Sequence, residues 1–387
     1  MHFVYLSPHF PPNYYPFCVE LRRAGVNVLG VADAPYEALR PELREALGEY
    51  YRVDDLHDYD QLVRTLGHFT HRHGKLDRVD SHSEYWLETE ARLRTDFNLF
   101  GLRADAIAGV KRKSRMKAIY REAGVPTARG AVVDTLEEGR ALVAEVGYPV
   151  VAKPDVGVGA AGTWKIHTPD ELAEFFARKP PVAYLLEEFV QGQLVSFDGL
   201  ADRDGEIVFC AAHAFSQGIM ETVNEDRDLF YYSLREIPPD LEEAGRRTVK
   251  AFGVRERFFH LEFFRADGDG RIVALEVNLR PPGGLTTDMF NYANDIDIYR
   301  QWAQVVAFNR FTAHYSRPYH CGYMGRKASK RYARSHAEVL RALGDGLVHH
   351  TPIDSIFRGA IGDYGYLVRS ADLDEVRHAA RLIQQLA

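Results

Sequence analysis

The chain has 387 residues, of which 46% are hydrophobic and 27% are charged, and its formal net charge is −7. This length predicts two or three domains around a sizeable core, and the negative charge argues against a nucleic-acid partner. No apolar run approaches ~18 residues, and the N-terminus lacks the basic start and apolar core of a signal peptide. Cys18, Cys210 and Cys321 are widely spaced. We therefore expect a cytoplasmic protein without a disulfide framework or a membrane partner.

The N-terminal region predicts an α/β unit. Apolar runs at residues 2–6 and 26–32 are typical of strands, and residues 15–25 have helical spacing that ends at a glycine. Short strands that alternate with helices indicate a parallel sheet covered on both faces. The first strand-to-helix loop contains no glycine, which argues against a dinucleotide site there.

Histidines appear twice in this region. His68, His71 and His73 match no standard zinc spacing, and a basic helix end is the favoured interpretation. His82 and Glu84 follow a strand-like run, where they either line a ligand crevice or have a structural role, and we favour the structural role.

Two lysines stand out in the next stretch. Lys113 precedes a predicted helix at residues 114–122, which a glycine at 124 and a proline at 126 bring to an end. On its own, the basic cluster at residues 111–117 is typical of a solvated helix face. Lys153 lies in a buried-strand pattern, YPVVAKP, so its ammonium must meet an anion or remain at the wet end of the strand.

A glycine-rich segment follows Lys153. Gly157, Gly159 and Gly162 match GxGxxG, but residues 163–167 look like a strand where a dinucleotide fold needs a helix. A glycine loop between two strands can still fold over a triphosphate, and a surface hairpin is the alternative. Residues 184–192 then predict a strand that leaves through a glycine turn, where backbone groups are available to an adenine edge.

Residues 257–284 predict a β-hairpin that carries acidic residues, with its turn at an Asp-Gly-Asp-Gly sequence. If the turn centres near residue 269, Glu262 lies across from Glu276 and Asn278 lies one pleat further along. Like charges in this arrangement destabilise a sheet unless a cation sits between them, and carboxylates with an amide oxygen suit Mg²⁺. We expect Val273, Leu275 and Val277 on one face, and Ala274, Glu276 and Asn278 on the other. Arg280 follows the second strand, where it can grip a phosphate.

The order of these motifs resembles the ATP-grasp superfamily over about residues 84–310. It runs from a lysine before a helix ending in AGVPT through YPVVAKP, a glycine loop, LLEEFVQG and HLEFF to ALEVNLRPPGG. The implied fold is α/β and α+β, with a Rossmann-like pre-ATP-grasp domain, an ATP-grasp fold and a small C-terminal αβ segment. The expected domains are residues 1–103, a lid subdomain at 104–190, a core subdomain at 191–310 and the segment 311–387.

The resemblance also implies roles for individual residues. Arg280 would steady the transferred phosphoryl group, and the turn at Gly283 and Gly284 would present backbone N–H groups to the substrate. The implied magnesium ligands are Glu262, Glu276 and Asn278. The implied ATP-binding residues are Lys113, Lys153, Gly157, Gly159, Gly162, Glu187, Glu188, Phe189, Val190 and Gln193. One departure concerns the ribose, because Leu194 stands near the place where the family often has an acid.

The implied activity is an ATP-dependent ligase that activates a small-molecule carboxylate as an acyl phosphate and couples it to an amine. The expected cofactors are ATP and Mg²⁺, for which Mn²⁺ could substitute. Amino acids are among the expected substrates. The oligomeric state is left open, with a homodimer as one possibility. The alternatives are an ATP-grasp kinase or carboxylase and a nucleotide-binding protein without turnover. No biotin-carrier segment is apparent, and the complete phosphoryl-transfer set disfavours a pure binder.

Two later segments remain open. Residues 213–235 stand where substrate contacts are common in the family, and His213, Arg227 and Arg235 either meet a carboxylate or lie on an exposed loop, which we favour. From about residue 311 we expect a small αβ tail with two strands and a final helix from residue 372. The basic run at 326–334 either reaches the site or forms a solvated surface, and we favour the solvated surface.

Overall fold

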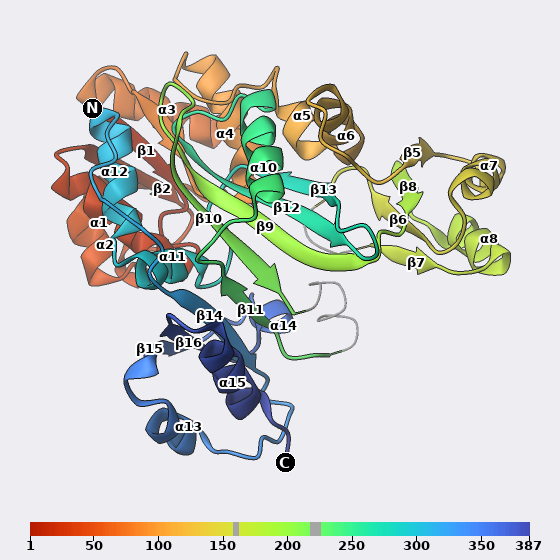
Figure 1. Cartoon of the computed structure of the whole chain (residues 1–387). Helices are drawn as coiled ribbons and strands as arrows, with labels where there is room; N and C mark the ends of the chain where they lie inside the picture. Colours follow the sequence, from red (N-terminus) through yellow and green to blue (C-terminus); the bar gives the residue numbers. More distant parts are fainter. Residues whose placement is uncertain (158–161, 217–225) are drawn as a thin grey trace.

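The N-terminal unit is a parallel sheet with helices on both faces. The computed structural model describes residues 1–157, 162–216 and 226–387 (Figure 1). The strand order is β3-β2-β1-β4. The strands are β1 (His2–Leu6), β2 (Asn27–Ala32), β3 (Leu47–Arg52) and β4 (Arg78–Asp80). The helices are α1 (Tyr15–Arg23), α2 (Pro41–Ala46), α3 (Tyr59–His73) and α4 (Leu87–Asp96).

Alternate side chains of β1 enter two different cores, which explains why both faces are covered. Phe3 and Tyr5 pack with residues of α1, α2 and α12 (Ile298–Phe308), whereas Val4 and Leu6 pack with α3 and α4. The predicted parallel sheet is therefore confirmed. His68 and His73 of α3 both bond the Glu49 carboxylate, at 2.7 and 2.6 Å, which fits the helix-end interpretation.

A small antiparallel sheet forms a second unit, which projects away from the rest of the chain with its two helices (Figure 1). Its strands, in spatial order, are β5 (Gly130–Val133), β8 (Tyr184–Glu188), β6 (Val150–Pro154) and β7 (Trp164–Ile166). The helices α7 (Leu136–Val146) and α8 (Pro169–Arg178) pack on it. It follows α5 (Ile107–Lys111) and α6 (Lys113–Glu122). Because β7 is a strand, the glycine segment before it does not open a helix, as predicted.

An eight-stranded antiparallel sheet forms the centre of the molecule. Its order is β13-β12-β9-β10-β11-β14-β16-β15, so strands from residue 320 onward continue the sheet that begins at residue 192. Its strands in chain order are β9 (Gly192–Ala201), β10 (Ile207–Phe215), β11 (Phe230–Ser233), β12 (Arg257–Ala266), β13 (Ile272–Asn278), β14 (His320–Arg326), β15 (Leu347–Pro352) and β16 (Tyr364–Ser370).

Helices cover both faces of this sheet. Residues of α6, α10 (Pro239–Ala251) and α15 (Leu373–Gln384) share one core with it, and α11 (Thr286–Asn294) and α12 pack on the other face. The short helices α13 (His336–Leu343) and α14 (Arg358–Ile361) lie in the C-terminal part. Within the described part of the chain, no helix combines the length and apolar character needed to cross a lipid bilayer.

The hairpin of β12 and β13 has the predicted register at its acidic residues. Glu262 pairs with Glu276, and His260 pairs with Asn278. The turn between the strands contains Gly268 and Gly270 at φ values of +90° and +71°, which residues with a side chain rarely adopt. The turn chemistry therefore fixes the pairing that brings the two carboxylates opposite each other.

The prediction for the faces of β13 was wrong. A β-bulge shifts the register so that Phe263 pairs with Ala274, which leaves Leu275 as an extra residue between two pairs. Ala274 and Val277 consequently enter the main core, whereas Leu275 packs with the cluster on the opposite face. The bulge thus turns an apolar side chain toward the side that Glu276 faces.

Candidate active site

A cavity of about 630 Å³ lies between the small sheet, the hairpin and the turn after β13. The predicted residues on its wall are Lys113, Lys153, Glu187, Glu188, Phe189, Val190, Glu262, Glu276, Arg280, Gly283 and Gly284. Gly157, Gly162, Gln193 and Asn278 are not on the wall, and Gly159 lies outside the described residues. Three units of the fold therefore bring most of the predicted set together.

The two hairpin carboxylates each have a cationic neighbour. The Nζ atom of Lys113, at the start of α6, lies 3.2 Å from Oε1 of Glu276, and Nε2 of His260 lies 3.0 Å from Oε1 of Glu262. Burial by itself would raise the pKa of Glu262, but the hydrogen bond and charge of His260 and the charge of Arg280 outweigh it and lower that pKa. These cations allow two carboxylates to face each other on paired strands.

The two carboxylates suit a Mg²⁺ ion whose other ligands are nucleotide phosphates and water. Across the ranges 1–157, 162–216 and 226–387, no group of three or more His, Cys, Asp or Glu side chains is placed to hold a metal ion. Mg²⁺ usually takes one or two carboxylates and fills its other positions with substrate phosphates and water. The residues that would hold it here are Glu262, Glu276 and Asn278, whose Oδ1 lies 3.5 Å from a guanidinium nitrogen of Arg280.

We accordingly expect Mn²⁺, used as a paramagnetic probe, to bind at least about tenfold more tightly when ADP is present than when it is absent. Water-proton relaxation measures this difference directly. Glu276→Gln should lose the nucleotide-dependent binding, whereas Asp269→Asn, at the exposed tip of the hairpin, should keep it. Tight binding of Mn²⁺ by the protein without nucleotide would contradict this arrangement.

Two buried lysines flank Glu187, which lies in β8 of the small antiparallel sheet. We call this sheet the lid sheet, and the unit that it forms with α7 and α8 the lid. One carboxylate oxygen of Glu187 lies 2.6 Å from Nζ of Lys153, and the other lies 2.7 Å from Nζ of Lys117. Burial raises the pKa of Glu187, but the two lysine charges outweigh this effect and lower it. The pKa of Lys117 is lowered, chiefly by burial. Glu187 is therefore an anion that neutralises two ammonium groups beside the cavity.

Lys117 was missed by the sequence analysis, which treated the basic cluster at 111–117 as a solvated face. That interpretation is wrong for Lys117, which is only 5% exposed, and Lys113, which the family resemblance had already set apart, is 7% exposed. The two residues are four apart in α6 and therefore share one face of the helix, which was the signal available in the sequence. Lys117 also donates to the backbone oxygen of Ala128 at 2.8 Å, which ties α6 to the lid.

The glycine segment that follows β6 begins beside Lys113. Lys113 donates from Nζ to the backbone oxygen of Gly157 at 3.1 Å. Gly162 has a φ of +73°, and a Cβ there would approach Pro154 and the hydroxyl of Tyr184 at 3.2 and 3.3 Å. A side chain would therefore be strained and crowded at Gly162, whereas a Cβ at Gly157 would meet only Pro154, at 3.8 Å.

The predicted hinge lies on the cavity wall, but Gln193 does not. Glu188 is bound by Arg129, whose Nε donates at 2.7 Å, and the ammonium of Lys165 lies 3.7 Å from the centre of the Phe189 ring. Gln193 is exposed and donates from its side-chain amide to the Phe215 carbonyl oxygen at 3.3 Å. Leu194, its neighbour in β9, lines the cavity instead. Strand alternation therefore turns the apolar side chain, not the amide, toward the cavity.

The turn after β13 is held by the N-terminal unit. The hydroxyl of Tyr14 donates to the Pro282 carbonyl oxygen, and the side-chain amide of Asn13 donates to the Gly284 carbonyl oxygen, both at 2.9 Å. Thr286 donates to the Gly283 carbonyl oxygen at 2.8 Å. These three hydrogen bonds to its carbonyl groups fix the turn in position beside Arg280. No local sequence pattern indicated these contacts, which join residues about 270 positions apart.

The C-terminal part also reaches the cavity. Phe357, Ala360 and Ile361, at α14, line it, and the Phe357 ring stacks on Phe10 with ring centres 5.8 Å apart. The first and last parts of the chain thus meet over the turn at Gly283 and Gly284. The sequence analysis considered contact with the site only for the basic run at 326–334, and it did not single out the residues of α14.

The carboxyl group of Asp288, next to this turn, should make the free energy of unfolding depend on pH. Burial raises its pKa to about 6 from an ordinary 3.8. The folded protein holds this proton more tightly than the unfolded chain, so the contribution is present below pH ~4 and is lost as the pH rises through ~6. In wild type, this carboxyl group should lower the free energy of unfolding by up to about 3 kcal/mol between pH 4 and pH 7. The Asp288→Asn variant should lack this contribution to the pH dependence. Denaturant titrations at several pH values measure it; a slope equal to that of wild type would contradict it.

Several other sequence interpretations need correction. His213 lies within β10, only 1% exposed, and its Nδ1 bonds the Asp198 carboxylate at 2.7 Å, so it lies neither on an exposed loop nor against a substrate. Arg235, in contrast, is exposed, as we favoured, and it donates to the backbone oxygens of Arg317 and Ala371. In the basic run, Arg326 and Lys327 are buried rather than solvated, because Arg326 bonds the Ile383 carbonyl and Lys327 bonds Asp226.

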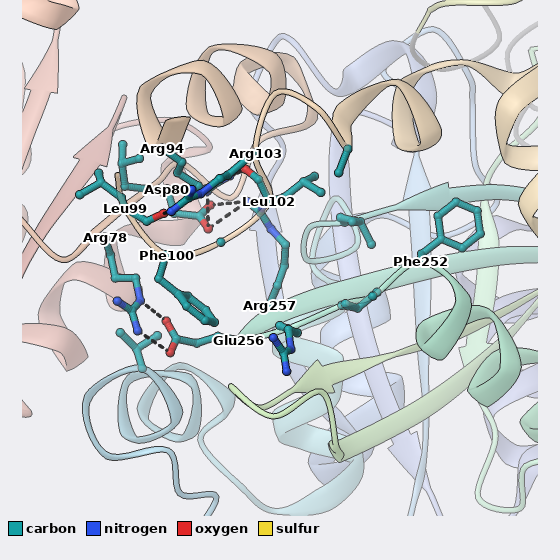
Figure 2. Close-up of a pocket in the computed structure, with 18 of the residues that line it drawn as sticks. Arg78, Asp80, Arg94, Leu99, Phe100, Leu102, Arg103, Phe252, Glu256 and Arg257 are labelled. Carbon is teal, nitrogen blue, oxygen red and sulfur yellow. Dashed lines mark hydrogen bonds and ion pairs between the residues drawn. The ribbon is translucent and has the colours of Figure 1, made fainter. Parts of the chain in front are cut away.

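A second cavity, of about 440 Å³, lies at the junction of the N-terminal unit and the central sheet (Figure 2). Its buried charges pair with one another. A guanidinium nitrogen of Arg257 lies 2.9 Å from the carboxylates of Asp80 and Glu90, and Arg94 bonds Glu90 at 2.8 Å. Figure 2 also shows Arg78 directed at Glu256. This network links β4 and α4 to β12, which fixes the N-terminal unit against the sheet that carries the hairpin.

Comparison with known proteins agrees with this geometry. Residues 146–288 match the ATP-grasp domain family. The L-arginine-specific L-amino acid ligase of Bacillus subtilis is 23% identical over 258 residues, which are 64% of this chain and 62% of that protein. The carbamoyl phosphate synthase large chain of a Mycobacterium species is 26% identical over 203 residues, 48% of this chain and 17% of that one. This chain thus spans less than two thirds of either curated relative.

A solved structure extends the likeness to the whole fold. The L-amino acid ligase from Bacillus licheniformis superposes with a TM-score of 0.76 and 17% identity, covering 100% of this chain and 97% of that one. The agreement includes the N-terminal unit and the C-terminal strands, outside the matched domain. With the paired carboxylates, lysines and glycine turn at one cavity, the family match shows that the chain contains an ATP-grasp domain.

Proposed function

We propose that this protein is an ATP-dependent ligase that joins a small-molecule carboxylate to an amine, with ADP and phosphate as the other products. The observation that carries the proposal is the set of groups on one cavity wall. Two carboxylates lie on paired strands, and Lys113, Lys153 and Arg280 lie around them. Phosphoryl transfer depends on positioning and charge neutralisation more than on covalent groups, and this set supplies both.

The proposed reaction has two steps. A carboxylate oxygen of the acid attacks the γ-phosphorus of ATP, the bond from that phosphorus to the oxygen of ADP breaks, and an acyl phosphate forms. The amine nitrogen then attacks the acyl carbon, the bond from carbon to the phosphate oxygen breaks, and phosphate leaves with the electron pair. The amine loses a proton to water or to the departing phosphate.

Individual residues have defined parts in this proposal. Lys113 and Lys153 bind phosphate oxygens, which replace the carboxylates they contact in the structure. Arg280 binds the transferred phosphoryl group, and the N–H groups of the turn at Gly283 and Gly284 face the acid. The strand and hinge at Glu187–Val190 accept the adenine. Glu262, Glu276 and Asn278 would hold Mg²⁺, which when bound would supply neutralising charge at the phosphates.

Two of the similar proteins are named as amino acid ligases. The Bacillus subtilis relative is named as an L-amino acid ligase, and so is the superposed Bacillus licheniformis structure. We therefore propose amino acids as the first candidates for both the acid and the amine.

The experiment is an ADP-release assay with ATP, Mg²⁺ and pairs of amino acids, in which the product is identified by mass. Ligation predicts a product with the mass of acid plus amine minus water, in step with ADP. Arg280→Ala should abolish it, and Arg271→Ala, at the exposed hairpin tip, should not. A product heavier by one phosphate would establish a kinase instead, and nucleotide binding without ADP release would establish a binder.

A further inference from the structure

The wall of the cavity carries charged side chains at one end and uncharged side chains at the other, and this contrast bears on which substrate the cavity accepts. This inference rests on the proposed function, because it concerns the acid that the ligase activates. The end beside the lid and hairpin carries the charged groups described above. The other end lies beyond the turn at Gly283 and Gly284, and its described wall residues are Phe215, Leu229, Tyr231, Thr286, Phe357, Ala360 and Ile361. We call it the apolar compartment.

The apolar compartment adjoins the turn directly. A Cβ on Gly284 would lie 3.3 Å from Cδ1 of Ile361 and 3.8 Å from the hydroxyl of Tyr231. Phe215 stacks on Tyr231 with ring centres 4.9 Å apart, and Leu229, Phe357 and Ile361 belong to the same apolar cluster. An acid whose carboxylate lies between Arg280 and the turn would therefore extend its side chain toward this cluster.

The polar groups of the apolar compartment are already bonded to each other. The hydroxyls of Tyr231 and Thr286 lie 2.8 Å apart, and Thr286 also bonds the carbonyl oxygen of Gly283 at 2.8 Å. Among the wall residues that the structure describes at this end, none carries a charge. A guanidinium, ammonium or carboxylate placed here would lose its hydration without gaining an ionic partner.

We propose that the acid substrate is an amino acid with an apolar side chain, of the size of leucine, methionine or phenylalanine. Full burial of such a side chain contributes about 1.5–3 kcal/mol, whereas a charged side chain would pay for desolvation. Together these effects give an expected preference in kcat/KM of at least about 10²-fold over arginine, lysine and aspartate.

Hydroxylamine tests the acid site without the amine site, because it converts an acyl phosphate to a hydroxamate. Hydroxamate and ADP would be measured for leucine, methionine, phenylalanine, arginine, lysine and aspartate as the only carboxylates. The expected result is efficient turnover of the first three. Preference for a charged acid, with hydroxamate still formed, would overturn this inference and leave the proposed ligase intact. No hydroxamate from any of the acids would overturn both.

Two substitutions locate the specificity in the apolar compartment. Ile361→Glu should reverse the ratio of leucine to lysine turnover by about 10²-fold or more, because a carboxylate then lies on the wall. Phe357→Ala, which only removes bulk, should favour phenylalanine over leucine relative to wild type. Ile356→Glu is the matched control, since Ile356 is 65% exposed in the same segment. An unchanged ratio in both wall variants would overturn the assignment.

Discussion

Replacement of Glu276 by Ala is expected to lower kcat/KM for ATP-dependent turnover by about 10³-fold or more. Glu276 is one of two carboxylates at the centre of the hairpin, and it lies 3.2 Å from Lys113. The substitution removes a proposed metal ligand and leaves Lys113 without its carboxylate. ADP release at saturating and limiting ATP measures the loss, and circular dichroism checks that the sheet is intact.

The matched control is Asp269→Ala, because Asp269 is an exposed carboxylate on the turn of the same hairpin. It should retain wild-type turnover. Glu276→Gln, which keeps the size and loses the charge, should resemble Glu276→Ala. Wild-type rates in either Glu276 variant would remove this residue from the proposed metal site, and with it the main support for the reaction.

Replacement of Glu187 by Gln is expected to cost about 3–5 kcal/mol of stability, the usual effect of breaking a buried ionic cluster. Lys117 and Lys153 would both be left buried beside a neutral group. Because the lid is one of several units, we expect it to unfold separately from the rest of the chain in this variant. Faster amide hydrogen exchange in β6 and β8 would measure this loss of local stability most directly.

A neighbouring residue provides the control for this effect. Glu188→Gln removes a carboxylate that pairs with Arg129, whose side chain is 63% exposed, so the loss should stay below about 1 kcal/mol. In a double-mutant cycle, Lys117→Met should recover part of the loss in Glu187→Gln, since one uncompensated charge is then removed. Equal destabilisation by Glu187→Gln and Glu188→Gln would show that the cluster is not energetically special.

The hairpin shows what local sequence can predict. Its register followed from turn glycines and strand alternation, both of which act over a few residues, and the pairing of Glu262 with Glu276 is as predicted. The bulge at Leu275 was not predictable in the same way, because it depends on which neighbours each side chain meets in the folded sheet. Alternation is thus reliable up to the point where tertiary packing inserts a residue.

The remaining omissions have a similar cause. Lys117 was overlooked because a basic cluster is usually solvated, and only the position of Glu187 on a different element shows otherwise. The burial of Arg326 and Lys327 depends on α15 and on residues near 226. The apolar compartment combines residues from four separated segments, so no single stretch of sequence carried its pattern.

The contacts of Tyr14 and Asn13 with the turn at 282–284 also bear on how the protein folds. They join residues about 270 positions apart, so the entropy of closing this loop must be lost before the contacts form. Contacts of such long range slow folding, and they are gained after the local hairpin. Newly made chains should therefore form the hairpin of β12 and β13 before residues 13 and 14 fix the turn at 282–284 in place.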